Sequence, residues 1–296
     1  MKDKTIPVQL DHCAVHTRDW TKTSPAFFDC GFVCNGGRNT ALEREQCLDG
    51  SVAYGDSGPL KLIHFFFENS YVENYCTPSG ESFSKGIIDP ECHAGLLMFV
   101  FATTRPFKAV AEAKQAGYRF QLGNSAVGVS RYADHGKNKG QMYATNGIVE
   151  DPPMYGYIMA YQHVENPELT YDNELYQHPN TVYRVEQLIV CCNDDEIYNN
   201  FDVKFREFSE LAGPKYRPDV GINELRLMDS EAVKSVFGVD FPAHQRGHGG
   251  IVFLAPDLEA VKCCIEKSGR TWRMTGEGLI TEPIAETGVF FLFRQG

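Results

Sequence analysis

Length and charge exclude several classes of protein before any motif is considered. The 296 residues are enough for one large or two medium domains with a buried core, and 43% of them are apolar, as in an ordinary globular protein. The net charge of −11 argues against nucleic acid as a main partner, because phosphate binding requires a basic surface.

Signals for targeting, membrane insertion and disulfide bonding are also lacking in the sequence. No window approaches the roughly 20 apolar residues that a membrane helix needs. The N-terminal Met-Lys-Asp-Lys-Thr-Ile-Pro has no apolar core for a signal peptide. The ten cysteines include two adjacent pairs but no Cys-x-x-Cys, which favours free, mostly buried thiols over a disulfide framework. We therefore expect a cytoplasmic protein with no membrane partner.

The first predicted unit combines a strand, a helix and a group of short strands. The strand covers residues 8–19, and the helix runs from Ser24 to Cys30, with a proline placed for its first turn and Gly31 at its end. Short β-rich runs, separated by Gly-Gly, Asp-Gly and Ser-Gly turns, follow at residues 32–38, 51–55 and 60–67. Residues 68–92 are polar and predict a connector.

A similar order of elements returns three times. The second unit has a strand at residues 93–102, a helix at 106–116, and strands at 126–132, 140–144 and 155–163. After a second polar connector, the third unit opens at Thr181 and has a helix at about 196–211, with phenylalanines at core spacing, and a strand at 223–228. The fourth has a strand at 248–257, a helix at 258–267 and a final strand at 288–294.

Two sequence similarities relate these units to one another. Without a gap, residues 10–19 align with residues 185–194, which places His12 opposite Gln187 on the same face of the equivalent strand. The second and fourth units also open alike, with His-Ala-Gly-Leu and His-Gly-Gly-Ile. Four related units in a chain of this length predict an α+β protein of two domains, at residues 1–165 and 180–296.

A βαβββ unit used twice to make a cupped half-barrel is typical of the vicinal oxygen chelate superfamily, which includes glyoxalase I and the extradiol dioxygenases. The chain resembles this superfamily, and in particular its large glyoxalase-like proteins, over nearly its whole length. The residues that carry the resemblance are Leu10-Asp-His-Cys-Ala-Val, Gly36-Gly-Arg, Gly247-His-Gly-Gly-Ile-Val and Gly288-Val-Phe-Phe-Leu-Phe. The resemblance implies four βαβββ units paired into two cupped half-barrels.

In this superfamily a metal lies in the cup, bound by His or Gln from the first strand of a unit and usually by Glu from the last. In this chain the first-strand positions are His12 and Gln187, whereas His64 stands where the last-strand Glu of unit one would be expected. The resemblance therefore implies a divalent ion (Zn, Ni, Mn or Fe) on His12, His64 and His93. A thinner alternative in the second pair of units is Gln187, Glu224 and His248.

Other polar side chains are candidates for chemistry and substrate binding. Arg38 and Arg131 would suit a carboxylate or enediolate, with ordinary surface salt bridges as the alternative. His135 beside Asp134 would form either an acid–base pair or a turn. We assign catalytic roles to Arg38, Arg131 and His135, and substrate contacts to Lys61, Tyr157 and His163.

The predicted function is that of a metal-dependent enzyme of isomerase or lyase type, which acts on a small oxygenated substrate in the cup. Two alternatives stay open: a metal-free small-molecule binding protein of the same fold, and a non-haem iron dioxygenase, which needs a carboxylate that the sequence does not make evident. Units in this superfamily pair within one chain or between chains, so a homodimer is the alternative to a monomer.

Overall fold

The computed structural model describes most of the chain. The described residues are 1–33, 61–76, 94–118, 127–133, 140–148, 157–165, 167, 171, 177–242 and 246–296. The strands predicted at 32–38 and 51–55 lie largely outside them.

The first two units occupy the N-terminal half of the chain. Unit one contains β1 (Asp3–Thr17), α1 (Trp20–Asp29), β2 (Lys61–Phe66) and β3 (Tyr71–Cys76). Unit two contains β4 (Gly95–Ala102), α3 (Pro106–Gln115), β5 (Val127–Ala133), β6 (Gly140–Ile148) and β7 (Ile158–Glu165).

The other two units follow in the C-terminal half. Unit three contains β8 (Arg184–Cys191), α4 (Asp195–Ala212), β9 (Ile222–Met228) and α5 (Ser230–Phe237), which the sequence did not predict. Unit four contains β10 (Gly249–Ala255), α6 (Leu258–Ser268), β11 (Trp272–Thr275), β12 (Gly278–Thr281) and β13 (Val289–Gln295).

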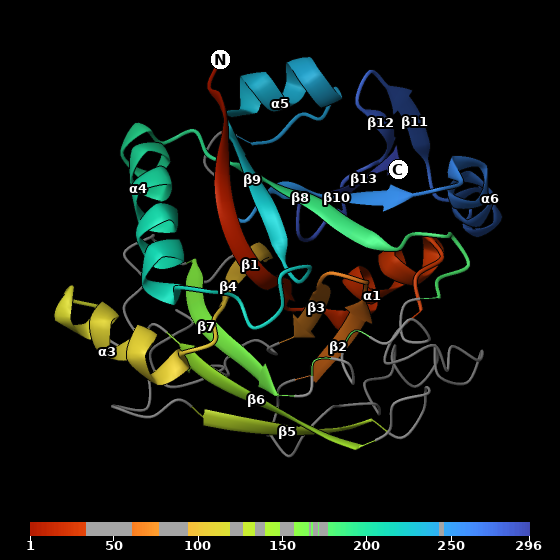
Figure 1. The fold of residues 1–296 in the computed structure, drawn as a ribbon. Helices are drawn as coiled ribbons and strands as arrows, with labels where there is room; N and C mark the ends of the chain where they lie inside the picture. Colours follow the sequence, from red (N-terminus) through yellow and green to blue (C-terminus); the bar gives the residue numbers. More distant parts are fainter. Residues whose placement is uncertain are drawn as a thin grey trace.

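The same pairing rule holds in all four units. The last strand of each lies parallel to its first strand, as β3 to β1, β7 to β4, β9 to β8 and β13 to β10. The first strands of neighbouring units then pair antiparallel, β1 with β4 and β8 with β10. This pairing confirms the predicted α+β architecture of paired βαβββ-type units. The described strands all belong to one curled sheet (Figure 1).

The two halves are joined through β1. Its N-terminal part pairs antiparallel with β9, from Asp3 opposite Met228 to Pro7 opposite Glu224. In Figure 1 the red β1 and the cyan β9 run side by side. Unit three has only two strands within residues 177–242, which are all described, so β1 occupies the edge of β9 that a third strand would otherwise take.

The prediction that residues 68–92 form a connector is wrong for its first part, because β3 lies there. This strand, Tyr-Val-Glu-Asn-Tyr-Cys, does not alternate between apolar and polar residues. Its two adjacent polar side chains face opposite sides and are both buried: Glu73 is 8% exposed and Asn74 is fully buried. Buried polar residues give a strand the composition of a loop, so a reading by hydrophobicity misses it.

Aromatic side chains dominate the main core, on the face of the sheet covered by α1 and α4. Phe27 of α1 stacks on Phe65 of β2, and Phe201 and Phe205 of α4 pack on each other as the helical spacing predicted. The cysteines described as free thiols are Cys13, Cys30, Cys191, Cys192, Cys263 and Cys264, in keeping with the predicted absence of a disulfide framework. In the described part of the chain, no helix has the length and apolar character to cross a membrane.

A buried histidine fastens the connector that precedes β8 to unit one. His178 Nδ1 accepts a hydrogen bond from the Val33 amide, and its Nε2 donates to the Phe66 carbonyl at 2.8 Å. Burial, the main cause, lowers the pKa of His178 from 6.5 to about 4, because the charged imidazole would lose its hydration. The folded protein therefore holds this ring neutral at pH values at which the unfolded chain protonates it.

This pKa difference predicts a loss of stability in mild acid. As pH falls below 6.5 toward 4, the unfolded state gains a proton first, so the wild type loses about 2 kcal/mol of unfolding free energy through His178 between pH 7 and pH 5. Urea titrations at both pH values measure it, with His178→Gln as the comparison. The variant's stability should fall less with pH by about that amount, and an equal fall in both proteins would contradict the assignment.

Candidate functional site

Two imidazoles and a carboxylate meet on one face of unit one. His64 Nε2 donates a hydrogen bond to Glu73 Oε1 at 2.9 Å, and His12 Nε2 lies 3.8 Å from the same oxygen. All three side chains are buried, with exposed fractions of 3% for His12, 2% for His64 and 8% for Glu73. We call this group the His12–His64–Glu73 cluster.

Strand pairing explains why these residues converge. Glu73 pairs directly with His64 of the antiparallel β2 and with Ala14 of the parallel β1. Paired residues share a face of the sheet, and so do residues two apart on one strand. His12, two residues before Ala14, therefore faces the same side as Glu73 and His64.

Unit two supplies an apolar wall beside the cluster. Val100 of β4 pairs with His12, and Ala160 of β7 pairs with Val100. Met98 and Ile158 occupy the next positions on the same face. These four positions are aliphatic, and the next position along the same face of β7 is the polar Gln162.

A second layer of polar contacts holds His12 from behind. Its Nδ1 donates to Asp11 Oδ1 at 2.6 Å, and its ring stacks on Tyr71 with 4.0 Å between ring centres. Gln162 of β7 donates to the same Asp11 oxygen at 2.7 Å and to the Tyr71 hydroxyl at 2.9 Å. Because a carboxylate only accepts hydrogen bonds, Nδ1 of His12 is the donor to Asp11, and Nε2 is the ring nitrogen that faces Glu73.

The cluster has a suitable set of metal donors but not a preformed coordination geometry. Across the described residues, no three His, Cys, Asp or Glu side chains are already arranged as a metal site. Here His64 and Glu73 hydrogen bond to each other instead. A metal would have to replace that hydrogen bond, with both Nε2 atoms and the Glu73 carboxylate turned toward one ion.

The structure reaches only some of the residues predicted from the sequence. It brings His12 and His64 together, whereas His93, Arg38 and His135 lie outside the described residues. Lys61 begins β2 and Arg131 lies in β5, but the described part of each is its backbone. The catalytic roles of Arg38, Arg131 and His135 and the substrate contact of Lys61 therefore stay predictions.

Tyr157 and His163 lie apart from the cluster. The Tyr157 ring packs against Phe201 of α4, and its hydroxyl accepts a hydrogen bond from the Gly247 amide at 3.1 Å. His163 Nδ1 lies 3.0 Å from the Thr103 carbonyl. Both alternate with Ile158 and Ala160 along β7 and so point to the other side of the sheet, and their predicted substrate contacts remain untested.

Sequence reasoning missed Glu73, Asp11 and Gln162. The available signal for Glu73 was its position between β-forming residues in Tyr-Val-Glu-Asn-Tyr-Cys, since the sequence of this strand does not alternate between apolar and polar residues. Asp11 directly precedes His12 in the chain, but the sequence alone does not show that their side chains form a hydrogen bond. Gln162 lies in the polar second half of β7, beside His163, and nothing in the sequence of that strand distinguishes it.

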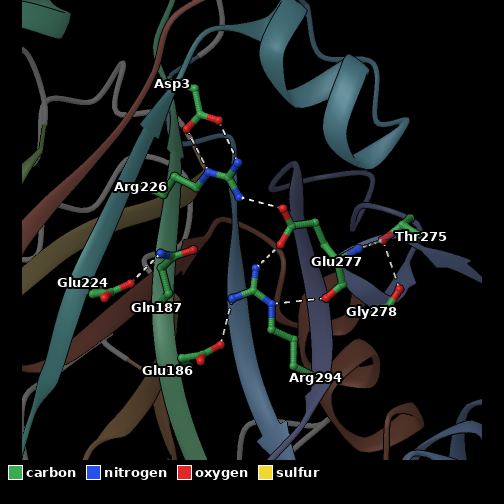
Figure 2. A network of polar contacts seen from close by, with 9 residues as sticks. All are labelled: Asp3, Glu186, Gln187, Glu224, Arg226, Thr275, Glu277, Gly278 and Arg294. Carbon is green, nitrogen blue, oxygen red and sulfur yellow. Dashed lines mark hydrogen bonds and ion pairs between the residues drawn. The ribbon is translucent and has the colours of Figure 1, made fainter.

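The second pair of units repeats the first-strand and last-strand arrangement with different chemistry. Gln187 of β8, which aligns with His12, donates from Nε2 to Glu224 Oε2 of β9 at 2.9 Å, and the two residues are directly paired (Figure 2). Gln187 is 5% exposed, and its Oε1 has no hydrogen-bond partner among the described residues. His248 packs on Phe241 roughly 13 Å further along the strand and does not join them.

Arginine–carboxylate pairs lie around Gln187 and Glu224 in the second pair of units, a region that we call the second face (Figure 2). Arg226 binds Asp3 through two hydrogen bonds of 2.8 and 2.7 Å and also reaches Glu277 at 3.3 Å. Arg294 bonds to Glu186 at 2.9 Å and to the other side of Glu277 (Figure 2). Each guanidinium thus already has two carboxylate partners, and the network ties β1, β8, β9 and β13 together rather than offering a free charge to a ligand.

We predict that this network contributes measurably to stability. Arg226→Met keeps an unbranched apolar stem but removes the bidentate pair of a side chain that is 15% exposed, so we expect a cost of about 2 kcal/mol. The matched control is Arg206→Met, which removes an exposed pair within α4 and should cost less than about 0.5 kcal/mol. Urea unfolding measures both, and equal costs would refute the prediction.

Comparison with known proteins identifies the fold. Neither a family model nor a curated protein sequence matches this chain. A hypothetical protein from Staphylococcus aureus is similar in structure, with a TM-score of 0.55 and 9% identity over 98% of this chain and 100% of that chain. A variant of 4-hydroxymandelate synthase from Streptomyces coelicolor has a TM-score of 0.52 and 10% identity over 98% of this chain and 93% of that chain.

A third similar structure is a fusion of a xylose isomerase-like TIM barrel with a 4-hydroxyphenylpyruvate dioxygenase. Its TM-score is 0.51 at 10% identity, over 98% of this chain and 49% of that chain. At such identities the likeness establishes the fold and leaves the chemistry to the site. The chain has the vicinal oxygen chelate fold, as its sequence predicted.

Proposed function

We propose that the His12–His64–Glu73 cluster binds a divalent metal ion and that the chain is a metal-dependent enzyme acting on a small oxygenated molecule. The observation that carries this proposal is the convergence of two buried imidazoles on one buried carboxylate. Two histidines and one carboxylate are a donor set for iron(II) in oxygenases and for zinc in hydrolytic enzymes. In this chain the carboxylate of that donor set is Glu73, which the sequence analysis did not identify.

The chain's own residues have distinct tasks in this proposal. The Nε2 atoms of His12 and His64 and the Glu73 carboxylate hold the ion, while Asp11 fixes the His12 ring through Nδ1. The apolar wall that includes Val100 limits water at the site and so strengthens its electrostatics. A bound divalent ion supplies Lewis-acid activation of vicinal substrate oxygens or, if it is iron, activation of dioxygen.

The donor set favours one reaction class over the other. Glu73 supplies the carboxylate that an iron-dependent oxygenase needs beside two histidines, and this supports placing that class ahead of the isomerase or lyase predicted from the sequence. An isomerase or lyase would use the same ligands with Zn, Ni or Mn as a Lewis acid. The identity of the bound ion therefore separates the two classes.

A metal-free binding protein is the second candidate, favoured by one specific observation. The His64–Glu73 hydrogen bond of 2.9 Å gives each of these two groups a partner without an ion. In that case the side chains of the cluster would form hydrogen bonds to an uncharged polar ligand. This candidate predicts that the protein stays free of metal even when ions are supplied.

Metal content distinguishes these candidates. We predict about one ion per chain in the wild type after anaerobic reconstitution, measured by inductively coupled plasma mass spectrometry, and loss of most of it in His12→Ala and Glu73→Gln, because each removes one of three ligands.

The matched control is Gln187→Ala, which removes the equivalent first-strand side chain of the second pair of units and should leave the metal content unchanged. A wild type that takes up no ion, or one that loses its ion only in Gln187→Ala, would overturn the proposal.

A further inference from the structure

One buried carboxylate receives hydrogen bonds from both halves of the chain. Asp11 has no exposed surface. Its Oδ1 accepts from His12 and from Gln162, both in the N-terminal half. Its Oδ2 accepts from the Tyr216 hydroxyl, and from the Tyr171 hydroxyl at 3.3 Å.

The position of Tyr216 is itself well determined. It lies in the segment between α4 and β9. The side-chain amide of Asn69 donates to the carbonyl of Gly221, at the end of this segment, at 2.9 Å, and to the carbonyl of Val185 in β8 at 2.8 Å. The Tyr216 hydroxyl also lies 3.0 Å from that of Tyr171. Asn69, in the turn between β2 and β3, thus fastens the strands that carry His64 and Glu73 to the segment that carries Tyr216.

Within the described part of the chain, the charge of Asp11 has no lysine or arginine partner. None of the described Lys or Arg side chains forms an ion pair with it, so its negative charge is balanced by neutral donors and by His12. A buried carboxylate without a cation is costly, and an apolar residue of similar size would serve folding alone at least as well. The arrangement becomes favourable when a positive ion is held on the far side of the His12 ring.

We propose that Tyr216, a residue of the second half of the chain, is a positioning residue for the metal site of the first half, and that it acts through Asp11 on His12. The inference rests on the proposed function. Tyr216 holds Asp11 so that the carboxylate accepts the Nδ1 proton of His12, and this keeps Nε2 free to bind the ion. Partners of this kind set the tautomer and basicity of a ligating histidine.

The expected effects differ between affinity and stoichiometry. Tyr216→Phe retains the ring and removes one donor, so we expect it to bind cobalt(II) about tenfold more weakly while it still binds about one ion per chain, because all three ligands remain. Asp11→Asn should weaken binding by about tenfold or more, since its amide can donate to Nδ1 and move the ring proton to Nε2. Competition with a chromophoric chelator measures both constants.

A second measurement reports the ring directly and needs no metal. In protein labelled with nitrogen-15 histidine, the wild type should show His12 as the Nδ1-protonated tautomer, Asp11→Asn should show the other tautomer, and Tyr216→Phe should show a mixture. The matched control is Tyr198→Phe, which removes a buried hydroxyl that bonds the Leu227 carbonyl at 3.3 Å, away from Asp11. We expect this variant to match the wild type in both measurements.

The outcomes separate this inference from the proposed function. If the wild type binds no cobalt(II), the proposed function is wrong and the inference falls with it. If the wild type binds cobalt(II) but Tyr216→Phe keeps both its affinity and its His12 tautomer, Tyr216 is not a positioning residue, although the metal site stands. Should Tyr216→Phe fail to fold, Asp11→Asn decides: wild-type affinity with the Nδ1 tautomer in that variant overturns the inference.

Discussion

The hydrogen bonds of β1 to three other strands are the constraint on which the rest of the structure depends. Its N-terminal part pairs with β9 of the second half, while its C-terminal part lies between β3 and β4. A register shift between Leu10 and His12, at the change from one set of neighbours to the other, is where Asp11 lies. The junction of the halves and the candidate site are therefore one region, which is why a tyrosine from the second half reaches a carboxylate beside a first-strand histidine.

The two pairs of units show how one scaffold takes up different chemistry. In both, a first-strand His or Gln faces a last-strand Glu, as His12 faces Glu73 and Gln187 faces Glu224. The residues before them, Asp11 and Glu186, have diverged in use: Asp11 orients a histidine, whereas Glu186 pairs with Arg294. In the second pair of units, salt bridges connect the strands. In the first pair, histidines, carboxylates and aliphatic side chains lie together. The vicinal oxygen chelate fold supports both outcomes because its cup does not depend on what lines it.

The sequence predicted the parts of this fold that follow from periodicity, including the helix α4 and the apolar strands β4, β10 and β13. It also placed His12 on the correct strand face through the internal repeat. It could not place Glu73, because a strand whose inward residues are polar has the composition of a loop. Nor could it find Tyr216, whose hydroxyl meets a carboxylate 205 positions away in the chain, a contact that only tertiary structure creates. The residues that the sequence analysis did not identify are thus buried polar residues. At such positions function is expected to override the local sequence pattern.

The central claim is that a divalent ion binds between His12, His64 and Glu73. Anomalous diffraction from crystals grown with the reconstituted ion, recorded at the absorption edge of that ion, locates it directly. The account predicts one peak within about 2.0–2.3 Å of both Nε2 atoms and of the Glu73 carboxylate, with the His64–Glu73 hydrogen bond replaced. A peak between Gln187 and Glu224, or an unbroken His64–Glu73 hydrogen bond with no peak beside it, would contradict the account.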